Sequence, residues 1–152
     1  MLSKKINIRV YYEDTDSGGI VYYANYFKFT ERCRTELLRE SGLSQTELLK
    51  NYDIKFIVHS VSMNYINPSY LDDNLTVETN IENFKKTSIV FDQKIYKVIK
   101  NNKNNKNNKN NKNNKNNKID IIESKCKIVC IDSNHKIIAM PDIISKKLLG
   151  EK

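Results

Sequence analysis

The sequence lacks the segments that would place the protein in a membrane or send it out of the cell. None of its apolar runs is long enough to span a bilayer. The first residues, Met1 to Lys5, lead straight into a strand-like pattern without the apolar stretch of a signal peptide. We therefore expect a cytoplasmic protein that does not insert into membranes.

Cysteine and histidine are scarce, and their spacing argues against metal sites and disulfides. The cysteines at 33, 126 and 130 are odd in number and form no C-x-x-C pair. On one strand, Cys126 and Cys130 would lie roughly 13 Å apart, at about 3.3 Å per residue, which is too far for a disulfide or a shared zinc ion. His59 and His135 are isolated histidines without metal-ligand spacing. We expect reduced, buried thiols and neither a metal nor another cofactor.

Most of the excess positive charge comes from one low-complexity segment. Residues 101–118 are six copies of Asn-Asn-Lys, and without their six lysines the formal net charge falls from +8 to +2. The segment has no apolar residue whose burial could offset its ordering entropy, so we predict a disordered insertion. No aromatic side chains are interleaved to stack on bases, and we expect no specific nucleic-acid partner.

The rest of the chain has the periodicity of an α+β fold and enough residues for one core. We therefore predict a single domain over 1–152, in which 101–118 lengthens a hairpin. Alternation of apolar and polar residues predicts a first strand ending at Tyr12 and further strands at 55–66, 75–82, 87–99 and 119–132. A long helix is expected over 24–41, ended by Gly42, followed by a short helix with a capping box at 44–47 and a C-terminal helix containing Ile144 and Leu148.

The most informative segment, 11–26, leads from the first strand through an acidic turn into the long helix. The helix stripe is formed by Tyr22, Tyr26, Phe29, Cys33 and Leu37. The turn places a carboxylate opposite the N-terminal end of this helix, which has unpaired N–H groups and the positive pole of the dipole. The Gly-Gly pair at 18–19 lets a ligand approach the backbone. Cleavage of an acyl group needs such an anionic base or nucleophile beside preorganised N–H donors.

This segment, Tyr-Glu-Asp-Thr-Asp-x-Gly-Gly-Ile-Val-Tyr followed by Ala-Asn-Tyr, resembles the signature of the YbgC-like acyl-CoA thioesterases. These are relatives of the 4-hydroxybenzoyl-CoA thioesterases and have the hotdog fold, an antiparallel β-sheet wrapped around one long central helix. Residues 65–73 and 87–91 resemble later motifs of the same family. The resemblance implies hydrolysis of an acyl-CoA thioester by a homodimer or homotetramer, with acyl carrier protein as a further candidate partner.

The resemblance also implies roles for individual residues. Asp16 matches the carboxylate that attacks the thioester or activates a water, and the backbone N–H of Tyr23 matches the group that polarises the carbonyl. Gly19 belongs to the turn that admits the substrate. A hairpin cluster resembles the residues that meet the CoA nucleotide, namely Lys85, Lys86, Thr87 and Ser88.

Each of these residues also has a structural interpretation. An aspartate in a turn before a helix is commonly a cap, as Asp16 would be, and Asp14 is interpreted as a structural carboxylate. Lysines in a hairpin are commonly just solvated, and Tyr22, Tyr26 and Phe29 are typical core residues. Many YbgC-like proteins have His where this chain has Tyr23, so the acyl group that the site prefers stays open.

Two other functions are compatible with such a fold. A hotdog dehydratase would use a histidine, and the opening motif has none. A non-catalytic protein could bind acyl-CoA or acyl carrier protein and associate with the cell envelope, as YbgC-like proteins associate with the Tol-Pal system. The intact Asp16, Gly18 and Gly19 favour retained chemistry.

Overall fold

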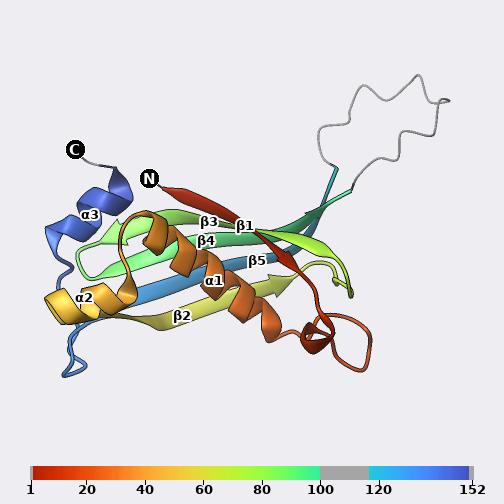
Figure 1. Cartoon of the computed structure of the whole chain (residues 1–152), viewed down its shortest axis with the longest axis horizontal. Coiled ribbons are helices and arrows are strands. Elements are labelled where there is room, and N and C mark those ends of the chain that lie inside the picture. The colour runs from red at the N-terminus through yellow and green to blue at the C-terminus, as the bar shows by residue number, and fades with distance from the viewer. Residues whose placement is uncertain (1, 100–116, 151–152) are drawn as a thin grey trace, which may run out of the picture.

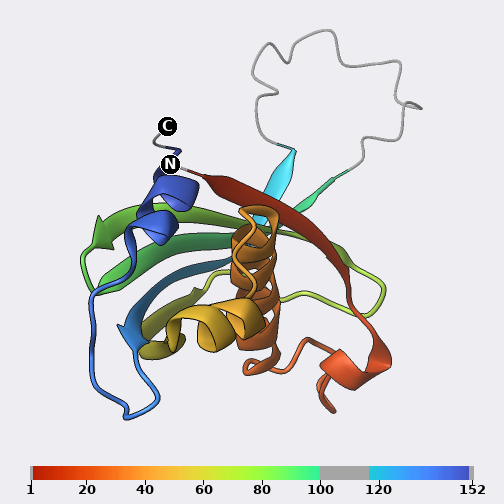
Figure 2. The same cartoon turned by 60° about the vertical axis from the view of Figure 1, so that its left-hand side comes forward.

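Five antiparallel strands form a sheet that curves around one long helix (Figures 1 and 2). The computed structural model describes residues 2–99 and 117–150. The strands pair in the order β1-β3-β4-β5-β2. The elements are β1 (Ser3–Arg9), α1 (Asn25–Glu40), α2 (Gln45–Tyr52), β2 (Lys55–Tyr65), β3 (Asn74–Lys85), β4 (Ser88–Val98), β5 (Lys118–Ile131) and α3 (Asp142–Leu149). This is the α+β arrangement that the sequence predicts.

The strand pairing aligns the inward-facing side chains across the sheet. Ile81 of β3 is opposite Phe91 of β4, which in turn is opposite Cys126 of β5. All three side chains are buried. The apolar alternation that predicted these strands therefore forms the continuous wall on which α1 packs.

The segment rich in Asn-Asn-Lys connects β4 to β5, as predicted. Val98 pairs with Lys118, and the N–H of Ile99 donates to the carbonyl of Asn117 at 2.7 Å. Lys118 is therefore the first residue of β5 and not part of the insertion. The predicted disorder of the remaining repeat falls on 101–116, which lie outside the described residues.

Helix α1 buries most of the predicted stripe. Tyr26, Phe29, Cys33 and Leu37 are buried, whereas Tyr22 precedes the helix and is 43% exposed. Tyr22 was wrongly predicted as part of the stripe, because the chain turns before the helix and the N–H of Asn25 bonds to the carbonyl of Tyr22. The helix ends as predicted, with Gly42 in the left-handed region at φ +70°.

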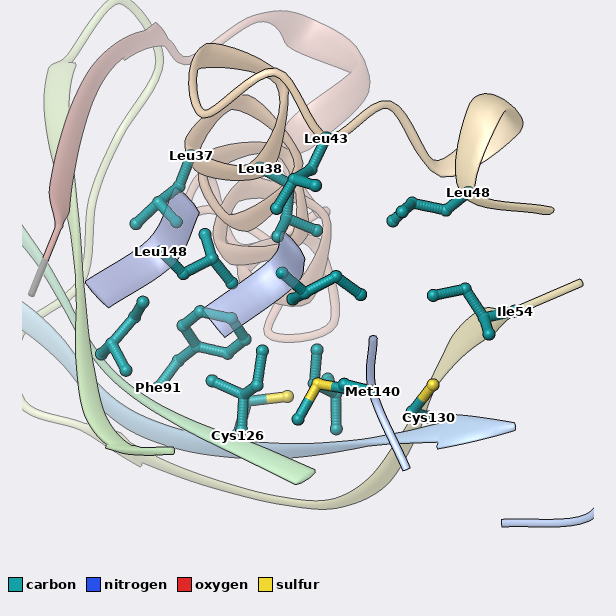
Figure 3. Close-up of a cluster of buried hydrophobic side chains, with 14 residues drawn as sticks. Leu37, Leu38, Leu43, Leu48, Ile54, Phe91, Cys126, Cys130, Met140 and Leu148 are labelled. Carbon is teal, nitrogen blue, oxygen red and sulfur yellow. The ribbon is translucent and has the colours of Figure 1, made fainter. Parts of the chain in front are cut away.

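Two apolar clusters fill the space between α1 and the sheet. The first is closed by α2 and α3 and is shown in Figure 3, where Leu37 and Leu38 face Phe91 and Cys126. The second lies nearer the start of α1 and is centred on buried side chains of α1 and the sheet, among them Phe29, Leu75, Val77, Ile95 and Ile122. The small α3 and the burial of its Ile144 and Leu148 agree with the prediction.

A row of polar side chains separates the two clusters. Thr79, Gln93 and Ser124 are opposite one another on β3, β4 and β5, and all are buried. The side-chain amide of Gln93 donates to Thr79 Oγ1 at 2.6 Å and to the carbonyl of Thr30 at 2.9 Å, and its oxygen accepts from Arg34 at 2.7 Å. These bonds attach α1 to the middle of the sheet.

Two local predictions are wrong. Strand β1 ends at Arg9, because Tyr12–Asp14 form a 3-10 turn in which the Asp14 carboxylate accepts the N–H of Tyr11 at 2.9 Å. Helix α2 begins after Ser44 as predicted, but the Ser44 side chain makes no capping hydrogen bond.

Within residues 2–99 and 117–150, no helix combines the length and apolar character needed to cross a membrane.

Candidate active site

The acidic turn between β1 and α1 is a narrow loop closed by backbone hydrogen bonds. The N–H of Asp16 donates to the carbonyl of Ile20 at 2.9 Å, and the N–H of Gly19 donates to the carbonyl of Asp16 at 3.0 Å. Gly19 has φ +77°, a conformation that favours glycine. A Cβ at Gly18 would lie 3.1 Å from Asp16 Oδ1. Both glycines therefore allow the turn that holds the aspartate.

The Asp16 carboxylate is exposed to solvent and is held by its own turn. Its Oδ1 accepts the N–H of Gly18 at 2.7 Å. This bond lies within the acidic turn and does not cap α1, which begins nine residues later at Asn25 and has no side-chain N-cap. The interpretation of Asp16 as a helix cap is therefore wrong. Among the described residues, Oδ2 has no hydrogen-bond partner. One carboxylate oxygen is therefore anchored, and the other is available to a ligand.

The start of α1 supplies unpaired N–H groups beside this turn. Helix α1 has no side-chain N-cap. Within the described part of the chain, no acceptor is found for the backbone amides of Tyr23 and Ala24. They lie at the positive end of the helix dipole, where a developing negative charge is stabilised.

Asp14 and Asn25 hold the segment that leads into the helix. The carbonyl of Asp14 accepts the N–H of Tyr22 and the side-chain amide of Asn25, each at 2.9 Å. Both Asp14 and Asn25 are buried. Asp14 therefore has the structural role that the sequence favoured for it.

Asp16 and Tyr23 line the same pocket, which has a volume of about 400 Å³. Its other walls come from the turn, the start of α1 and the chain after β2: Ile20, Val21, Tyr26, Tyr65, Ile66, Asn67 and Pro68. Apart from Asp16 and Asn67, this lining is aliphatic or aromatic. The structure thus brings the predicted carboxylate and the predicted amide donor together at an apolar cavity.

The aromatic wall of the pocket is fixed by two tyrosines. The rings of Tyr26 and Tyr65 lie 5.9 Å apart, and the Tyr26 hydroxyl is 2.6 Å from Ser69 Oγ, a buried hydrogen bond. Burial raises the pKa of both phenols above the ordinary value. Tyr26 is thus a buried core residue, as expected, and a wall of the pocket as well.

The cluster predicted to meet CoA, residues 85–88, does not line the pocket of Asp16. Residues 85–88 form the hairpin between β3 and β4, as the sequence indicated. The N-terminal half of β3 pairs with β1, so this hairpin lies at the opposite end of the sheet from the acidic turn (Figure 1). A single protomer does not bring the two lysines and Asp16 to one pocket.

Several residues of the pocket have no role predicted from the sequence. Ile20 and Val21 follow the Gly-Gly pair, and Tyr65, Ile66 and Pro68 belong to a segment noted only for its resemblance to a family motif. The clue was present in that motif. The motif does not reveal that its two ends are neighbours of the acidic turn. Ile20 pairs with Tyr70, and the N–H of Val21 donates to the carbonyl of Ser69, so these contacts join residues 20–21 to residues 69–70.

Residues 18–100, more than half of the chain, match the family model of the thioesterase superfamily. The chain belongs to this superfamily. The match begins two residues after Asp16, so membership of the thioesterase superfamily is established by the residues that follow the carboxylate.

Two curated relatives of this superfamily member are YbgC proteins. The acyl-CoA thioester hydrolase YbgC of Escherichia coli O157:H7 is 47% identical over 88 residues, which cover 58% of this chain and 65% of that protein. The acyl-CoA thioesterase YbgC of Haemophilus influenzae is 43% identical over 90 residues, covering 59% and 66%. The matched segment thus spans just under two thirds of each relative.

A solved structure confirms the fold. A variant of 4-hydroxybenzoyl-CoA thioesterase in complex with 4-hydroxybenzoyl-CoA has a TM-score of 0.81 to this chain, covering 96% of this chain and 98% of that chain. Its sequence is only 16% identical, so this similarity concerns the fold alone. The predicted hotdog fold of this thioesterase-superfamily chain is correct.

Proposed function

We propose that this protein hydrolyses acyl-CoA thioesters to a free acid and CoA. The observation that carries the proposal is the shared pocket of Asp16 and Tyr23, where one carboxylate oxygen of Asp16 and the amide of Tyr23 have no hydrogen-bond partner among residues 2–99 and 117–150. The YbgC relatives, whose names state acyl-CoA thioester hydrolysis, support the same reaction.

The two sides of the pocket would act on different atoms of the thioester. The carbonyl oxygen would accept the N–H of Tyr23, which stabilises the negative charge that develops there. Asp16 would act at the carbonyl carbon in one of two ways. As a nucleophile it forms a C–O bond, expels CoA as a thiolate and leaves an anhydride that water cleaves. As a general base it takes a proton from the water that attacks.

The position of the hairpin cluster supports an oligomer. Lys85 and Lys86 lie at the far end of the sheet from Asp16, so they would meet the phosphates of the same CoA only from a second copy of the chain. Strand β2 leaves one edge of the sheet unpaired among the described residues and exposes apolar side chains there, at Ile57, Val58 and Val61. We therefore propose a homodimer through β2, or a homotetramer built from it, with Gly19 and residues 85–88 among the substrate contacts.

The cellular setting and further partners are part of the same proposal. All three cysteines are free and buried, which suits the reducing cytoplasm. Acyl carrier protein stays a candidate partner because it presents the same kind of thioester. A dehydratase is disfavoured because neither His59 nor His135 lines the pocket of Asp16.

The direct test is release of free thiol from a panel of short-chain, long-chain and aromatic acyl-CoAs. Hydrolysis of at least one of them is the expected result, and the panel also identifies the preferred acyl group. Binding of acyl-CoA without thiol release from any member would favour the non-catalytic alternative and contradict the proposal.

A further inference from the structure

Tyr65 lies at the end of β2 and contacts the segment that carries the amide donor. Its hydroxyl donates to the carbonyl of Tyr23 at 3.1 Å. Its ring lies 6.4 Å from the ring of Tyr23 and 5.9 Å from that of Tyr26. Tyr65 is 42 residues away from Tyr23 in the sequence, so this contact joins the sheet edge to the start of α1.

The other hydrogen bonds of this segment hold the neighbours of Tyr23: the carbonyl of Tyr22 accepts the N–H of Asn25, and the carbonyl of Ala24 accepts the N–H of Phe27. Tyr23 is 58% exposed, its ring lies 4.7 Å from that of Tyr22, and the start of α1 has no side-chain cap. The preceding residues are held through the N–H groups of Val21 and Tyr22. On the carbonyl side of Tyr23, the bond found among the described residues comes from Tyr65.

We propose that Tyr65 is a positioning residue, whose hydroxyl holds the Tyr23 carbonyl so that the backbone amide of Tyr23 keeps its orientation at the pocket. The proposal rests on the proposed function. Because the peptide group is planar, fixing the Tyr23 carbonyl also fixes the N–H of Ala24, and it restrains the rotation that would move the N–H of Tyr23. Small displacements of such a donor reduce the rate strongly.

The Tyr65 phenol can make this bond over the whole range in which a carboxylate acts. Burial raises its pKa above the ordinary value of 10, and the neighbouring Tyr23 raises it further. The hydroxyl therefore keeps its proton at neutral pH. Its effect on the reaction should not depend on pH below the titration of the phenol.

Tyr65→Phe removes the hydroxyl and keeps the ring. We expect kcat for the preferred acyl-CoA to fall about 10-fold, while KM changes less than about twofold, because an oxyanion donor acts mainly on the transition state. The dependence of kcat/KM on pH should keep its shape, since Tyr65→Phe leaves every other ionisable group in place. The melting temperature and the oligomeric state should match those of the wild type.

Tyr52→Phe is the matched control. Tyr52 ends α2, away from the pocket, and its exposed fraction of 47% is close to the 49% of Tyr65. The same substitution there should leave kcat and KM unchanged.

The two proposals fail in different ways. An active wild type whose Tyr65→Phe variant keeps full kcat would overturn the positioning role alone. The same holds for a variant whose only change is a raised KM, because Tyr65 would then be a wall of the pocket. Absence of thiol release by the wild type would overturn the proposed function and this inference with it.

Discussion

Asp16 shows how one residue can serve the turn and a reaction together. Its Oδ1 bond to the N–H of Gly18 is a structural contact, typical of aspartate in turns. The same bond fixes the carboxylate in one orientation, and this leaves Oδ2 in a defined place beside the pocket. A role in holding the turn is therefore compatible with a catalytic role for this side chain.

Cys130 provides a prediction about pH and stability. Burial raises the pKa of its thiol from 9.0 to about 11. Between these values the unfolded chain releases the proton and the folded chain keeps it, so the free energy of unfolding falls as pH rises through this window. Below pH 9 both states are protonated and the thiol has no effect.

The loss should reach roughly 2 kcal/mol by pH 11 and should be measurable by urea denaturation at several pH values between 8 and 11. Cys130→Val is the control, because valine is of similar size and does not titrate. Its stability should fall less steeply than that of the wild type over this window. Equal slopes for the two proteins would contradict the assignment.

At the scale of elements, α1 is the part that connects the core to the site. Its middle is attached to the sheet through Gln93, which bonds to Thr30 and Arg34. Its N-terminal end presents the amides of Tyr23 and Ala24. The polar row in the core therefore helps to set where those amides lie relative to the sheet.

The hairpin between β4 and β5 should tolerate replacement of residues 101–116 by a short glycine-containing turn. Its ends already meet, since the N–H of Ile99 bonds to Asn117 and Val98 pairs with Lys118. We expect kcat within a few-fold of the wild type and a gain of about 1 kcal/mol from the shorter loop. The formal net charge falls from +8 to +3 because five lysines leave.

Urea denaturation and thiol release at low and high salt would check this replacement. A change in kcat/KM at low salt alone would indicate that the removed lysines attract the anionic substrate. Loss of folding, or of turnover at every salt concentration, would show that the replaced residues are structural.

Local patterns predicted the elements well, and contacts distant in sequence account for the errors. The alternation of Leu75, Val77 and Ile81 was sufficient to identify β3, because each side chain only has to face one layer. The end of β1 was missed because the Asp14 carboxylate stabilises a 3-10 turn where alternation suggested a strand. The separation of Lys85 from Asp16 follows from the pairing of β1 with β3, which no local pattern contains.

At the scale of the whole molecule, we expect little monomer at about micromolar concentration. A monomer would leave the edge of β2 unpaired and its apolar side chains exposed. It would also leave the proposed substrate contacts divided between two ends of the sheet. Sedimentation velocity would measure this. Val61→Lys, near the middle of the free edge, should raise the monomer fraction, whereas Val98→Lys, at the end of β4, should not. A wild-type monomer with full activity would contradict the shared site.

The central claim is that Asp16 acts on an acyl-CoA thioester, and kcat of Asp16→Asn for the preferred acyl-CoA tests it most directly. Asparagine can still accept the N–H of Gly18, so the turn and the melting temperature should be preserved. The lost carboxylate should lower kcat by at least about 100-fold, as removal of a general base or nucleophile does. A folded Asp16→Asn variant with the turnover of the wild type would contradict the account.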